Sequence, residues 1–556
     1  MLQICSVSGV PIALVQCDVT VGALHANGPK IARLAGEARA AGASVIVFPE
    51  LVLSGYPPED LVLKKHFTED CRRELDRLGA ELPGDALTVV GAPWVEGGQV
   101  FNAAIVYAGH ERVLVYKKML LPNYGVFDEQ RVFEPGAGPG VVEFQGVRIG
   151  FHICEDSWYP DAVPCKAMKG AVDLVINISA SPYHRGKHAV REEVLGKAAQ
   201  AMQCPLFYCN LVGGQDELVF DGASMVFVAD GGLVARAPQF HEHVLQVKVP
   251  TIGKTGEKTS KDWKKEIAPL LEDPAEVYAA LKLGLRDYVD KNGFQKVVVG
   301  LSGGIDSAFV ATVAVDALGA SRVVGVTMPS QFTSKETLGD AELIAKNLGI
   351  PLHAVPIRQI HELYLKELAP LWPGRQPDAT EENLQARIRG NIVMALSNKF
   401  GWLVLTTGNK SEMATGYCTL YGDMAGGFAL IKDVPKTLVY ALSRWRNTQP
   451  GPAPIPQATI DRPPTAELKP GQKDTDSLPP YDVLDAIIER YVERDLSADQ
   501  IAAEGCDAAT VKRVIRMVDR NEYKRRQGAP GVKITPKAFG RDRRLPITNL
   551  YGERVT

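Results

Sequence analysis

The stretch KVVVGLSGGIDSA, residues 296–308, decides the fold of the second half of this chain. A β-branched run ends at Gly300, and Ser-Gly-Gly then leads to Asp306 and Ser307. A buried strand that ends in glycines just before a helix presents backbone N–H groups to a phosphate. The stretch has neither the lysine of a GxxxxGK[ST] loop nor the glycine spacing of the G-x-G-x-x-G fingerprint. It therefore predicts a phosphate loop of another kind, with a carboxylate where the others place a cation.

The position of Asp306 beside the predicted phosphate site indicates a bound metal ion. Two anions repel each other strongly in a site of low dielectric constant, so a divalent cation is needed between a carboxylate and a phosphate. Asp306 is therefore a candidate Mg²⁺ ligand. A loop without a lysine for the γ-phosphate also suits chemistry at the α-phosphate, where pyrophosphate leaves and AMP is transferred. We expect the second half of the chain to adenylate a substrate, the alternative being a plain glycine-rich turn.

Strands and helices alternate along the whole chain, which predicts an α/β fold. After residue 275 the strand-like runs are KVVVGLSGG, RVVGVTMPS, LHAVPI and WLVLTTGN. Strict alternation of such runs with helical patterns is typical of a doubly wound parallel sheet. A charged, turn-rich segment near residues 250–275 interrupts the pattern. We therefore predict a first domain over 1–250, a linker over 251–275 and a second domain over 276–556.

The length and composition predict a cytoplasmic protein with more than one domain. A chain of 556 residues is too long for one ordinary core, and a formal net charge of −3 shows no basic excess that would indicate a nucleic-acid partner. The start of the sequence lacks the features of a signal peptide, and no apolar run is long enough to span a membrane. None of the nine cysteines forms a CxxC pair, which argues against a zinc site or a disulfide framework. We expect most of these thiols to be small core residues.

A second polar stretch lies where the predicted sheet would bring it next to the phosphate loop. The segment TTGNKSEMATGYCTLYGDMAGG follows a predicted strand and contains Glu412 and Asp423. In a doubly wound sheet, ligands bind outside the carboxyl ends of the strands. Glu412 is therefore expected to face the same metal ion as Asp306.

The motifs of the second half closely resemble those of one enzyme family. The loop GLSGGIDS is similar to that of the ATP pyrophosphatases. With ENLQARIRG, TGNKSEMATGY, YGDMAGG, PKTLVYALSRWRN and PPTAELKPGQKDTDSLPPYDVLD, it resembles the NAD synthetase family over nearly all of residues 275–556. In that family ATP adenylates the nicotinic acid carboxylate of deamido-NAD⁺, and the adenylate is then amidated.

The resemblance assigns roles to individual residues of the second half. By that likeness ATP is bound by Gly300, Leu301, Ser302, Gly303, Gly304, Ile305, Asp306, Ser307 and Thr407. Deamido-NAD⁺ is bound by Asn383, Glu412, Asp423 and Lys524, and Mg²⁺ by Asp306 and Glu412. Without the motif match, Thr407 reads as an ordinary strand-end hydroxyl and Asn383 as a solvated residue of a first helical turn. The basic stretch around Lys524 reads as a solvated face.

The first half contains a candidate nucleophile with two matching partners. The segment GFHICEDSW places Cys154 at the end of a strand that enters a turn, which exposes a nucleophile and leaves N–H groups free for an oxyanion. Glu50 ends the run SVIVFPE, and Lys118 lies in YKKMLLPNYGVFDEQ. A carboxylate can accept the thiol proton, and an ammonium can stabilise the oxyanion and lower the pKa of the thiol. The competing interpretations are an inert core thiol at Cys154 and Lys117 in place of Lys118.

The same segments resemble the nitrilase superfamily over roughly residues 11–250. The resemblance implies an α-β-β-α sandwich with a catalytic triad of Glu50, Lys118 and Cys154. The segment PNYGVFDE is similar to that of the glutaminase members that are fused to NAD synthetase. By that likeness, the residues that contact glutamine are Tyr124, Ser181 and Lys187. Residues 1–10 precede the usual start of the family and are interpreted as an extension.

Together the two resemblances predict a glutamine-dependent ligase. Glutamine is hydrolysed in the first domain and its ammonia converts deamido-NAD⁺ to NAD⁺ in the second, with release of AMP, pyrophosphate and glutamate. A sealed route for ammonia favours a homo-oligomer. A tRNA-thiolating enzyme would need a basic docking surface, and an asparagine synthetase would need a cysteine where this chain has Leu2. A binding protein that has lost catalysis stays open as an alternative.

Overall fold

The structure, a computed structural model, describes residues 9–249 and 263–551. The chain forms two compact units, of which the first comprises Met1–Gln215 and Val219–Leu271 and the second Asp216–Leu218 and Glu272–Thr556. The predicted domain limits stay predictions. Residues 1–8 of the predicted extension at 1–10 and residues 251–262 of the predicted linker lie outside the described residues. No helix in the described part of the chain is long and apolar enough to cross a membrane.

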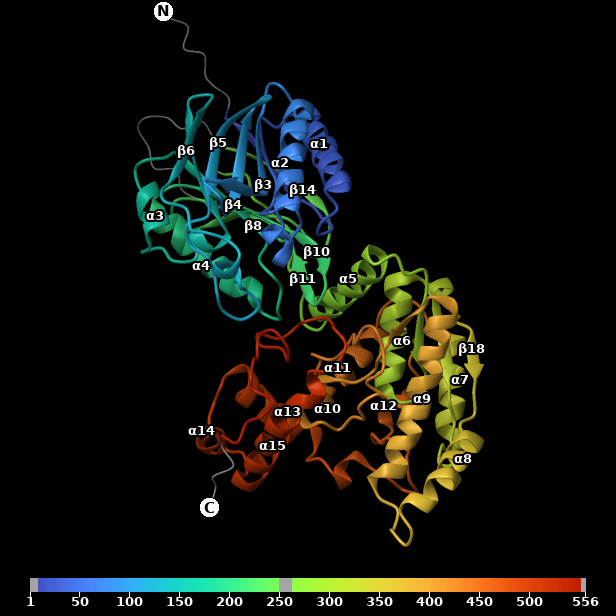
Figure 1. The fold of residues 1–556 in the computed structure, drawn as a ribbon. Helices are drawn as coiled ribbons and strands as arrows, with labels where there is room; N and C mark the ends of the chain where they lie inside the picture. The colour runs from blue at the N-terminus through green and yellow to red at the C-terminus, as the bar shows by residue number, and fades with distance from the viewer. Residues whose placement is uncertain (1–8, 250–262, 552–556) are drawn as a thin grey trace, which may run out of the picture. The chain divides into compact units, whose positions relative to one another are not determined.

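Two β-sheets form the middle of the first unit (Figure 1). The first sheet has the order β14-β1-β2-β3-β4-β5 and the second the order β15-β13-β12-β9-β8-β7-β6. The first consists of β1 (Pro11–Gln16), β2 (Val45–Val47), β3 (Leu87–Glu96), β4 (Gln99–Ala108), β5 (Glu111–Lys117) and β14 (His243–Lys248). The second consists of β6 (Gly140–Phe144), β7 (Val147–Ile153), β8 (Leu174–Ser179), β9 (Leu206–Asn210), β12 (Met225–Phe227), β13 (Leu233–Arg236) and β15 (Glu266–Ile267). A separate hairpin pairs β10 (Val212–Gln215) with β11 (Leu218–Asp221).

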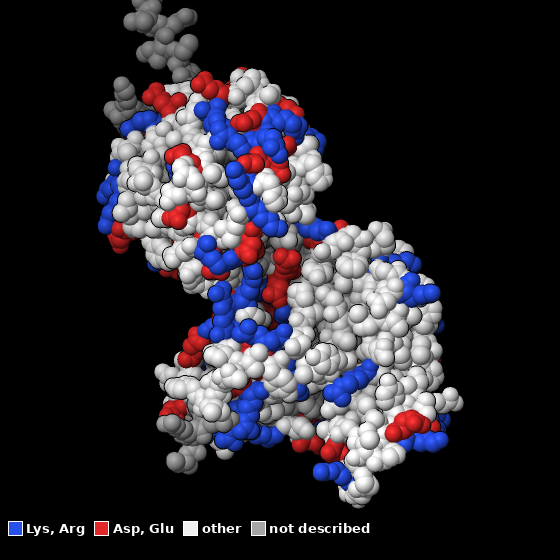
Figure 2. Space-filling view, viewed as in Figure 1, with Lys and Arg blue, Asp and Glu red and all other residues white. Residues whose placement is uncertain are grey.

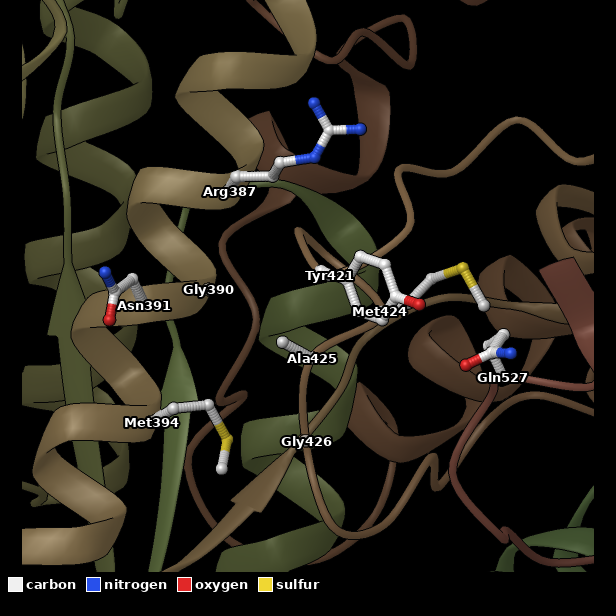
Figure 3. Close-up of a pocket in the computed structure, with 9 residues that line it drawn as sticks. All are labelled: Arg387, Gly390, Asn391, Met394, Tyr421, Met424, Ala425, Gly426 and Gln527. Carbon is white, nitrogen blue, oxygen red and sulfur yellow. The ribbon is translucent and has the colours of Figure 1, made fainter. Parts of the chain in front are cut away.

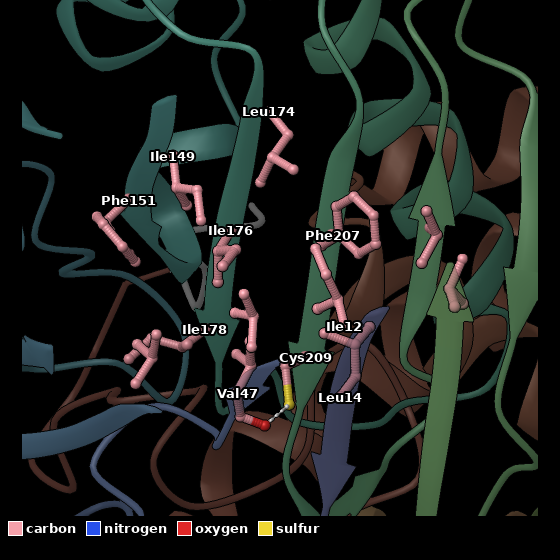
Figure 4. Close-up of a cluster of buried hydrophobic side chains, with 14 of the residues drawn as sticks. Ile12, Leu14, Val47, Ile149, Phe151, Leu174, Ile176, Ile178, Phe207 and Cys209 are labelled. Atoms are coloured by element: carbon pink, nitrogen blue, oxygen red, sulfur yellow. Dashed lines mark hydrogen bonds between the residues drawn. The ribbon is translucent and has the colours of Figure 1, made fainter. Parts of the chain in front are cut away.

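Helices cover the outer face of each sheet (Figure 1). The first sheet carries α1 (Leu24–Ala40) and α2 (Lys65–Glu81), and the second carries α3 (Val163–Met168) and α4 (Lys187–Met202). Apolar side chains of both sheets meet in one buried cluster between them (Figure 4). Within it the Cys209 thiol of β9 donates to the Val47 carbonyl of β2 over 3.4 Å. The predicted α-β-β-α sandwich is confirmed.

β8 shows why strands of this unit read as continuous apolar runs. All of its residues, Leu174–Ser179, are buried. Ile176 and Ile178 point into the cluster between the sheets, whereas Val175 packs in a second cluster with residues of α3 and α4. A strand covered on both faces has no solvent side, so its sequence does not alternate with a period of two.

α1 begins earlier than the sequence pattern predicts. The stretch NGPKIARLAGEARAAG, residues 27–42, predicts a helix that starts near Asn27 and Gly28. The helix instead begins at Leu24, and both residues are buried within it. The Asn27 side-chain amide donates to the carbonyls of Thr20 (2.8 Å) and Leu53 (3.0 Å). Asn27 therefore serves a tertiary contact, which a capping pattern in the sequence cannot distinguish from a helix terminus.

A parallel sheet with the order β18-β17-β16-β19 is the centre of the second unit. Its strands are β16 (Val297–Gly300), β17 (Val323–Thr327), β18 (Leu352–Ala354) and β19 (Leu403–Leu405). The order reverses between β16 and β19, which makes their carboxyl ends the switch point where ligands bind in such folds. The predicted doubly wound parallel sheet is confirmed.

Helices surround this sheet and extend beyond it (Figure 1). Those that alternate with the strands or flank them are α5 (Ala275–Lys291), α6 (Ile305–Leu318), α7 (Lys335–Leu348), α8 (Arg358–Leu368), α9 (Ala379–Phe400), α10 (Lys410–Thr415) and α11 (Lys436–Asn447). The later helices are α12 (Gln457–Asp461), α13 (Tyr481–Ile488), α14 (Ala498–Ala503), α15 (Ala508–Arg520) and α16 (Glu522–Arg525). α13 and α15 form a separate apolar cluster that includes Ala414 of α10. That cluster fixes α10, the helix that carries Glu412.

Charges on the surface of the first unit are intermingled rather than segregated. Lys and Arg lie among Asp and Glu on the face shown in Figure 2. On the two outer helices, Arg33 pairs with Glu37 at 2.7 Å, and Arg77 pairs with Glu74 and Glu81 at 2.5 Å. Such exposed pairs contribute little to stability because solvent screens them. Six of the eight described cysteines are buried and all eight are free, as expected of core thiols.

Candidate active sites

Cys154 lies in the turn that follows a buried strand. β7 ends at Ile153, and Cys154–Ser157 form a short 3-10 helix. Cys154 has a φ of +43°, in the left-handed region that a non-glycine residue adopts only when its surroundings hold it there. The Asn177 side chain of β8 donates to the Cys154 carbonyl over 3.1 Å. The prediction that Cys154 ends a strand is confirmed, and the residue is buried.

Glu50 and Lys118 form a buried ion pair. Lys118 Nζ donates to Glu50 Oε1 over 2.7 Å, and both side chains are 1% exposed. Asn102 Nδ2 donates to the same oxygen over 2.7 Å, and the Ala180 N–H donates to Glu50 Oε2 over 2.8 Å. Both oxygens of Glu50 therefore have donors, which fixes the carboxylate in one orientation.

The loop that carries Glu50 packs tightly against β3 at Gly91. A Cβ atom at Gly91 would lie 2.3 Å from the Leu51 nitrogen and 2.4 Å from the Pro49 carbonyl oxygen. Both distances are far inside van der Waals contact, so only glycine permits this approach of two backbones. Gly91 therefore helps to determine where Glu50 lies.

Burial and neighbouring charges set the protonation states of this site. Burial raises the pKa of the Cys154 thiol well above its ordinary value, the Glu50 carboxylate raises it further, and the Lys118 ammonium lowers it in part. The thiol is therefore protonated at rest, and its reaction needs a base. Burial alone would lower the pKa of Lys118, but Glu129 and Glu50 outweigh burial and raise it. Lys118 is consequently an ammonium.

Glu129 is a further buried group of this site that the sequence did not reveal. Its Oε1 accepts from Lys118 Nζ and from the Tyr56 hydroxyl, each over 2.9 Å. Burial raises the pKa of Glu129, Lys118 opposes that shift, and Glu50 adds to it. Glu129 belongs to PNYGVFDE, which carries the resemblance, but an acidic residue in a turn-rich stretch has no local pattern that marks it.

Two of the predicted glutamine contacts face the nucleophile turn. The Tyr124 side chain is about half exposed, and its hydroxyl donates to both carboxylate oxygens of Glu155, over 3.0 and 3.1 Å. The Lys187 ammonium lies 4.4 Å from the centre of the Trp158 ring. Glu155 and Trp158 belong to the turn that begins at Cys154, so both predicted residues lie next to it.

The third predicted glutamine contact, Ser181, is buried in the loop after β8. Arg191 approaches both its hydroxyl and its carbonyl at 3.4 Å. Arg191 is itself fully buried and contacts both carboxylate oxygens of Asp221 at 3.0 Å. The same loop supplies the Ala180 N–H that binds Glu50, so Ser181 is held in a fixed position relative to the triad.

The predicted phosphate loop connects β16 with α6. Gly303 has a φ of +89°, and a Cβ atom there would lie 2.1 Å from the Thr337 carbonyl oxygen, so glycine is required. The Ser307 hydroxyl donates to the Gly304 carbonyl (3.0 Å) and accepts from the Ser302 N–H (3.2 Å). These bonds hold a compact turn at the N-terminus of α6, where the helix favours a bound anion.

The carboxylates of Asp306 and Glu412 lie on either side of one lysine. Lys436 Nζ donates to Asp306 Oδ2 and lies 3.7 Å from Glu412 Oε1. Asn409 Nδ2 donates to Asp306 Oδ1 over 3.1 Å, and its own Oδ1 accepts the Glu412 N–H over 3.0 Å to cap α10. Thr407 follows β19 at the same end of the sheet. The structure therefore gathers these residues at the carboxyl ends of β16 and β19.

The site beside the phosphate loop has two carboxylates and one ammonium. Burial raises the pKa of Glu412, the Asp306 charge raises it further, and Lys436 opposes both. Burial alone would lower the pKa of Lys436, but Asp306 and Glu412 together raise it. When both carboxylates are ionised, one ammonium leaves one negative charge uncompensated, so a second cation would be stabilised here.

Two carboxylates fit Mg²⁺, which is usually bound through one or two carboxylates together with substrate phosphates and water. Within residues 9–249 and 263–551, no group of three or more His, Cys, Asp and Glu side chains could hold a metal ion. Asp306 and Glu412 would therefore share the ion with the phosphates of ATP rather than enclose it.

Lys436 was missed by the sequence analysis. The stretch PKTLVYALSRWRN contributes to the resemblance, but no local pattern gives its lysine a role. The contact with Asp306 spans 130 residues of sequence, and a lysine at the start of a helix reads as solvated unless the fold is known. A residue-by-residue comparison of the stretch PKTLVYALSRWRN with the family motif could have identified Lys436.

Three of the predicted dinucleotide contacts meet at residues 416–423, directly after α10. Asn383 Oδ1 accepts from the Thr419 hydroxyl over 2.7 Å, and Asp423 Oδ1 accepts from the Thr419 N–H over 2.6 Å. Lys524 Nζ donates to two carbonyls of the same segment, over 2.7 and 2.8 Å. The structure therefore brings these three residues together next to the helix of Glu412.

A cavity of about 470 Å³ lies beside that segment (Figure 3). Its lining residues are Arg387, Gly390, Asn391 and Met394 of α9, Tyr421, Met424, Ala425 and Gly426 of the loop, and Gln527. Arg387 Nε also donates to the Leu420 carbonyl over 3.2 Å. None of the predicted site residues lines this cavity, so the sequence analysis did not identify it.

Two family models match separate parts of the chain. The family described as Carbon-nitrogen hydrolase matches residues 11–255. The family described as NAD synthase matches residues 277–528. The first match contains the site around Cys154, and the second contains the phosphate loop and Glu412.

Relatives similar over nearly the whole chain share one name. The glutamine-dependent NAD(+) synthetase of Thermotoga maritima is 47% identical over 570 residues, covering 98% of this chain and 99% of that protein. That of Xanthomonas campestris pv. campestris is also 47% identical, covering 97% of each. The structure of the glutamine-dependent NAD+ synthetase from Acinetobacter baumannii in complex with adenosine diphosphate matches with a TM-score of 0.78 at 42% identity, covering 97% of this chain and 99% of that one. A Cytophaga hutchinsonii structure, at 24% identity and a TM-score of 0.83 over 98% of each chain, shares the fold.

Proposed function

The chain belongs to the family of glutamine-dependent NAD(+) synthetases, and from this premise we propose that it forms NAD⁺ from deamido-NAD⁺, ATP and glutamine. The other products are AMP, pyrophosphate and glutamate. The observation that carries the proposal is the buried Lys118 ammonium between Glu50 and Glu129, together with the protonated Cys154 thiol whose pKa their charges influence. A buried base, cation and nucleophile are what amide hydrolysis needs.

Glutamine hydrolysis proceeds through a thioester in this proposal. Glu50 takes the Cys154 proton as the sulfur attacks the side-chain amide carbon, and the carbonyl oxygen becomes an oxyanion. Protonated Glu50 then gives that proton to the leaving nitrogen, the C–N bond breaks, and ammonia departs. Glu50 next deprotonates a water molecule that attacks the thioester, which releases glutamate and restores the thiol.

The hydrogen bonds of Lys118 suit it to stabilise the oxyanion. An ammonium has three donors, and Lys118 uses one on Glu50 and one on Glu129. The third is left for the developing negative charge. Because the two carboxylates already hold the ammonium in place, little reorganisation is needed when the oxyanion forms, which is the condition for effective electrostatic stabilisation.

Tyr124, Ser181 and Lys187 are proposed to bind glutamine. Lys187 carries a positive charge at the nucleophile turn, which suits the α-carboxylate of an amino acid. Tyr124 is the most exposed of the three, and its hydroxyl contacts Glu155. The negative charge of the Glu155 carboxylate suits the α-ammonium of glutamine. Ser181 would offer its fixed hydroxyl close to the triad.

Adenylation is proposed to take place at the phosphate loop. The compact turn at 300–307 and the N-terminus of α6 would bind the phosphates of ATP, and Thr407 lies at the adjacent strand end. A Mg²⁺ ion held by Asp306 and Glu412 would supply positive charge to the pyrophosphate leaving group. Lys436, already placed between these carboxylates, would add the protein's own cation to the same phosphates.

Deamido-NAD⁺ is proposed to bind along residues 416–423. Asn383, Asp423 and Lys524 converge on this segment, next to Glu412. The neighbouring cavity offers room for part of a dinucleotide, and Arg387 at its edge suits a pyrophosphate or carboxylate. Ammonia would attack the adenylated carboxyl carbon here and displace AMP.

A homo-oligomer and a cytoplasmic location stay predictions of the sequence. A reaction that passes ammonia between two sites benefits from a closed route, and subunit contacts are one way to provide it. Light scattering of the active enzyme tests the first, and only a monomeric species under assay conditions would contradict it.

The proposed function is tested by identifying the products. The purified protein is incubated with ATP, Mg²⁺, glutamine and deamido-NAD⁺, and mass spectrometry follows NAD⁺, AMP, pyrophosphate and glutamate. We expect the four products in equal amounts. No NAD⁺ should form when ATP or deamido-NAD⁺ is left out. ATP consumption without NAD⁺ formation, or NAD⁺ formation without AMP, would contradict the proposal.

A further inference from the structure

One buried carboxylate joins the nucleophile turn to the segment of the catalytic lysine. Asp156 is fully buried and lies two residues after Cys154. Its Oδ2 accepts from the Ile153 N–H over 3.0 Å and from the Tyr116 hydroxyl over 2.8 Å. Its Oδ1 accepts from the N–H groups of Met119 and Leu120, over 3.1 and 2.8 Å.

The donors to Asp156 come from both sides of the proposed reaction centre. Ile153 directly precedes Cys154, so its N–H belongs to the turn that carries the nucleophile. Met119 directly follows Lys118, so its N–H belongs to the backbone that carries the ammonium. The Asp156 side chain therefore accepts hydrogen bonds from the backbone next to Cys154 and from the backbone next to Lys118. A shift of either segment would break a hydrogen bond to this buried carboxylate.

The backbone conformation of Cys154 gives these bonds a purpose. A φ of +43° is strained for a residue with a Cβ atom, and such a conformation persists only where the surrounding contacts hold it. The N–H of the preceding residue is fixed by Asp156, and the carbonyl of Cys154 is fixed by Asn177. The turn is therefore held on both sides of the sulfur-bearing residue.

We propose that Asp156 is a positioning residue for glutamine hydrolysis, which sets the distance and orientation of Cys154 relative to Lys118. The inference rests on the proposed function of this site. Asp156 acts through the backbones of Ile153 and Met119 and takes no part in proton transfer. A carboxylate is needed because the two oxygens of Asp156 accept all four hydrogen bonds. The amide of an asparagine would keep only one acceptor oxygen and would turn its N–H₂ group towards two of the donors.

The test compares Asp156→Asn with two further variants. Tyr116→Phe removes a single donor from Asp156 and leaves the rest of the network intact. Asp173→Asn is the matched control, because Asp173 also accepts a backbone N–H at β7, from Arg148 over 2.8 Å, but at the opposite end of that strand. NAD⁺ formation is measured with glutamine and with ammonium as donors, and iodoacetamide reports the reactivity of Cys154.

In Asp156→Asn we expect kcat with glutamine to fall by about 10- to 100-fold, since a displacement of about 1 Å costs roughly that much. KM for glutamine should stay within about twofold, alkylation of Cys154 should slow, and the ammonium-dependent rate should be unchanged. Tyr116→Phe should lose about two- to fivefold in kcat with glutamine, and Asp173→Asn should match the unchanged protein.

A wild-type kcat with glutamine in Asp156→Asn would overturn the inference, and so would a loss confined to KM. If Asp156→Asn does not fold, Tyr116→Phe decides: a lower kcat with glutamine alone supports the inference, and a wild-type kcat overturns it. Cys154→Ala in the same series separates this inference from the proposed function. Glutamine-dependent synthesis by Cys154→Ala would refute the thioester step of the proposed function. Loss of glutamine-dependent synthesis in Cys154→Ala beside a fully active Asp156→Asn would refute the inference alone.

Discussion

Two lysines of this chain each lie between a pair of carboxylates. One group is buried, and the carboxylates of the other are partly exposed to solvent. Lys118 donates to Glu50 and Glu129 over 2.7 and 2.9 Å, and none of these three side chains is more than 5% exposed. Lys436 contacts Asp306 closely but lies 3.7 Å from Glu412. The carboxylates around Lys436 are 17% and 18% exposed.

The difference separates a fixed site from one that can exchange its partners. Around Lys118, direct and buried hydrogen bonds to both carboxylates already place the charges for an oxyanion. Around Lys436, the carboxylates lie in the first turns of α6 and α10 and keep contact with solvent. A metal ion and phosphates can therefore enter that site and take over part of the contacts with the ammonium.

Among substitutions of these two lysines and their carboxylate partners, Lys118→Met gives the largest expected effect, because it leaves Glu50 and Glu129 buried without their cation. Glutamine-dependent NAD⁺ formation should fall by at least about 10³-fold, and the first unit should lose about 3–5 kcal/mol of stability. The control is Lys117→Met, which removes the partly exposed neighbour that pairs with Glu96. Activity assays with both donors and unfolding in urea measure the effects. If Lys117→Met were inactive and Lys118→Met active, the assignment of the catalytic lysine would be wrong.

Asp306→Asn should reduce NAD⁺ formation from glutamine and from ammonium alike, by about 10²-fold or more. The substitution removes a negative charge that the proposed Mg²⁺ ion needs, while glutamine hydrolysis in the other unit should continue. Asp316→Asn on the same helix is the control, since Asp316 pairs with Arg446 away from the loop. Full ammonium-dependent activity of Asp306→Asn would contradict the metal assignment.

Lys436→Met should lower kcat with both donors by about 10²-fold, because the phosphates lose a cation. It should also lower the Mg²⁺ concentration needed for half-maximal ATP binding, since Asp306 and Glu412 are then no longer paired with an ammonium. Calorimetric titration of Mg²⁺ in the presence of ATP measures that change. A weaker Mg²⁺ requirement supports the account of an exchangeable site, and an unchanged or stronger one refutes it.

Among the substitutions around the two lysines, Glu129→Gln should have the smallest effect, a loss of about 10-fold in glutamine hydrolysis, because the amide oxygen can still accept from Lys118. Burial raises the pKa of Glu129. In the unchanged protein this carboxylate therefore becomes protonated at a higher pH than an ordinary glutamate does. That protonation weakens the hold on Lys118 and lowers activity. The acidic limb of the pH profile should therefore move to lower pH in Glu129→Gln, and an identical limb would show that another group titrates.

Local sequence patterns were sufficient to predict β16, α6 and β7 and the residues at which the two strands end. The β-branched run before Ser-Gly-Gly predicts a strand and loop, and the structure has β16 followed by α6. GFHICEDSW predicts a strand that ends at the nucleophile, and β7 ends at Ile153. In both cases strand propensity and glycine or turn chemistry lie within a few residues, so the sequence contains the whole signal.

The remaining partners could not be predicted because their contacts span long stretches of sequence. Glu129 and Lys436 belong to motifs that carry the resemblance, yet nothing near them distinguishes a buried ion pair from a solvated charge. Asn27 illustrates the opposite error, since a residue typical of a helix terminus lies inside α1 and binds the carbonyls of Thr20 and Leu53. Only the fold shows which charged residues lose their solvent.

The central claim is that Cys154 releases the nitrogen that the second unit attaches to deamido-NAD⁺. The most direct measurement is NAD⁺ formation by Cys154→Ala, with glutamine and with concentrated ammonium salt as alternative donors at a pH that favours free ammonia. The account predicts no glutamine-dependent synthesis and an ammonium-dependent rate close to that of the unchanged protein, because the variant lacks only the sulfur that forms the thioester. Retained glutamine-dependent synthesis would contradict it and leave Cys154 as a core thiol.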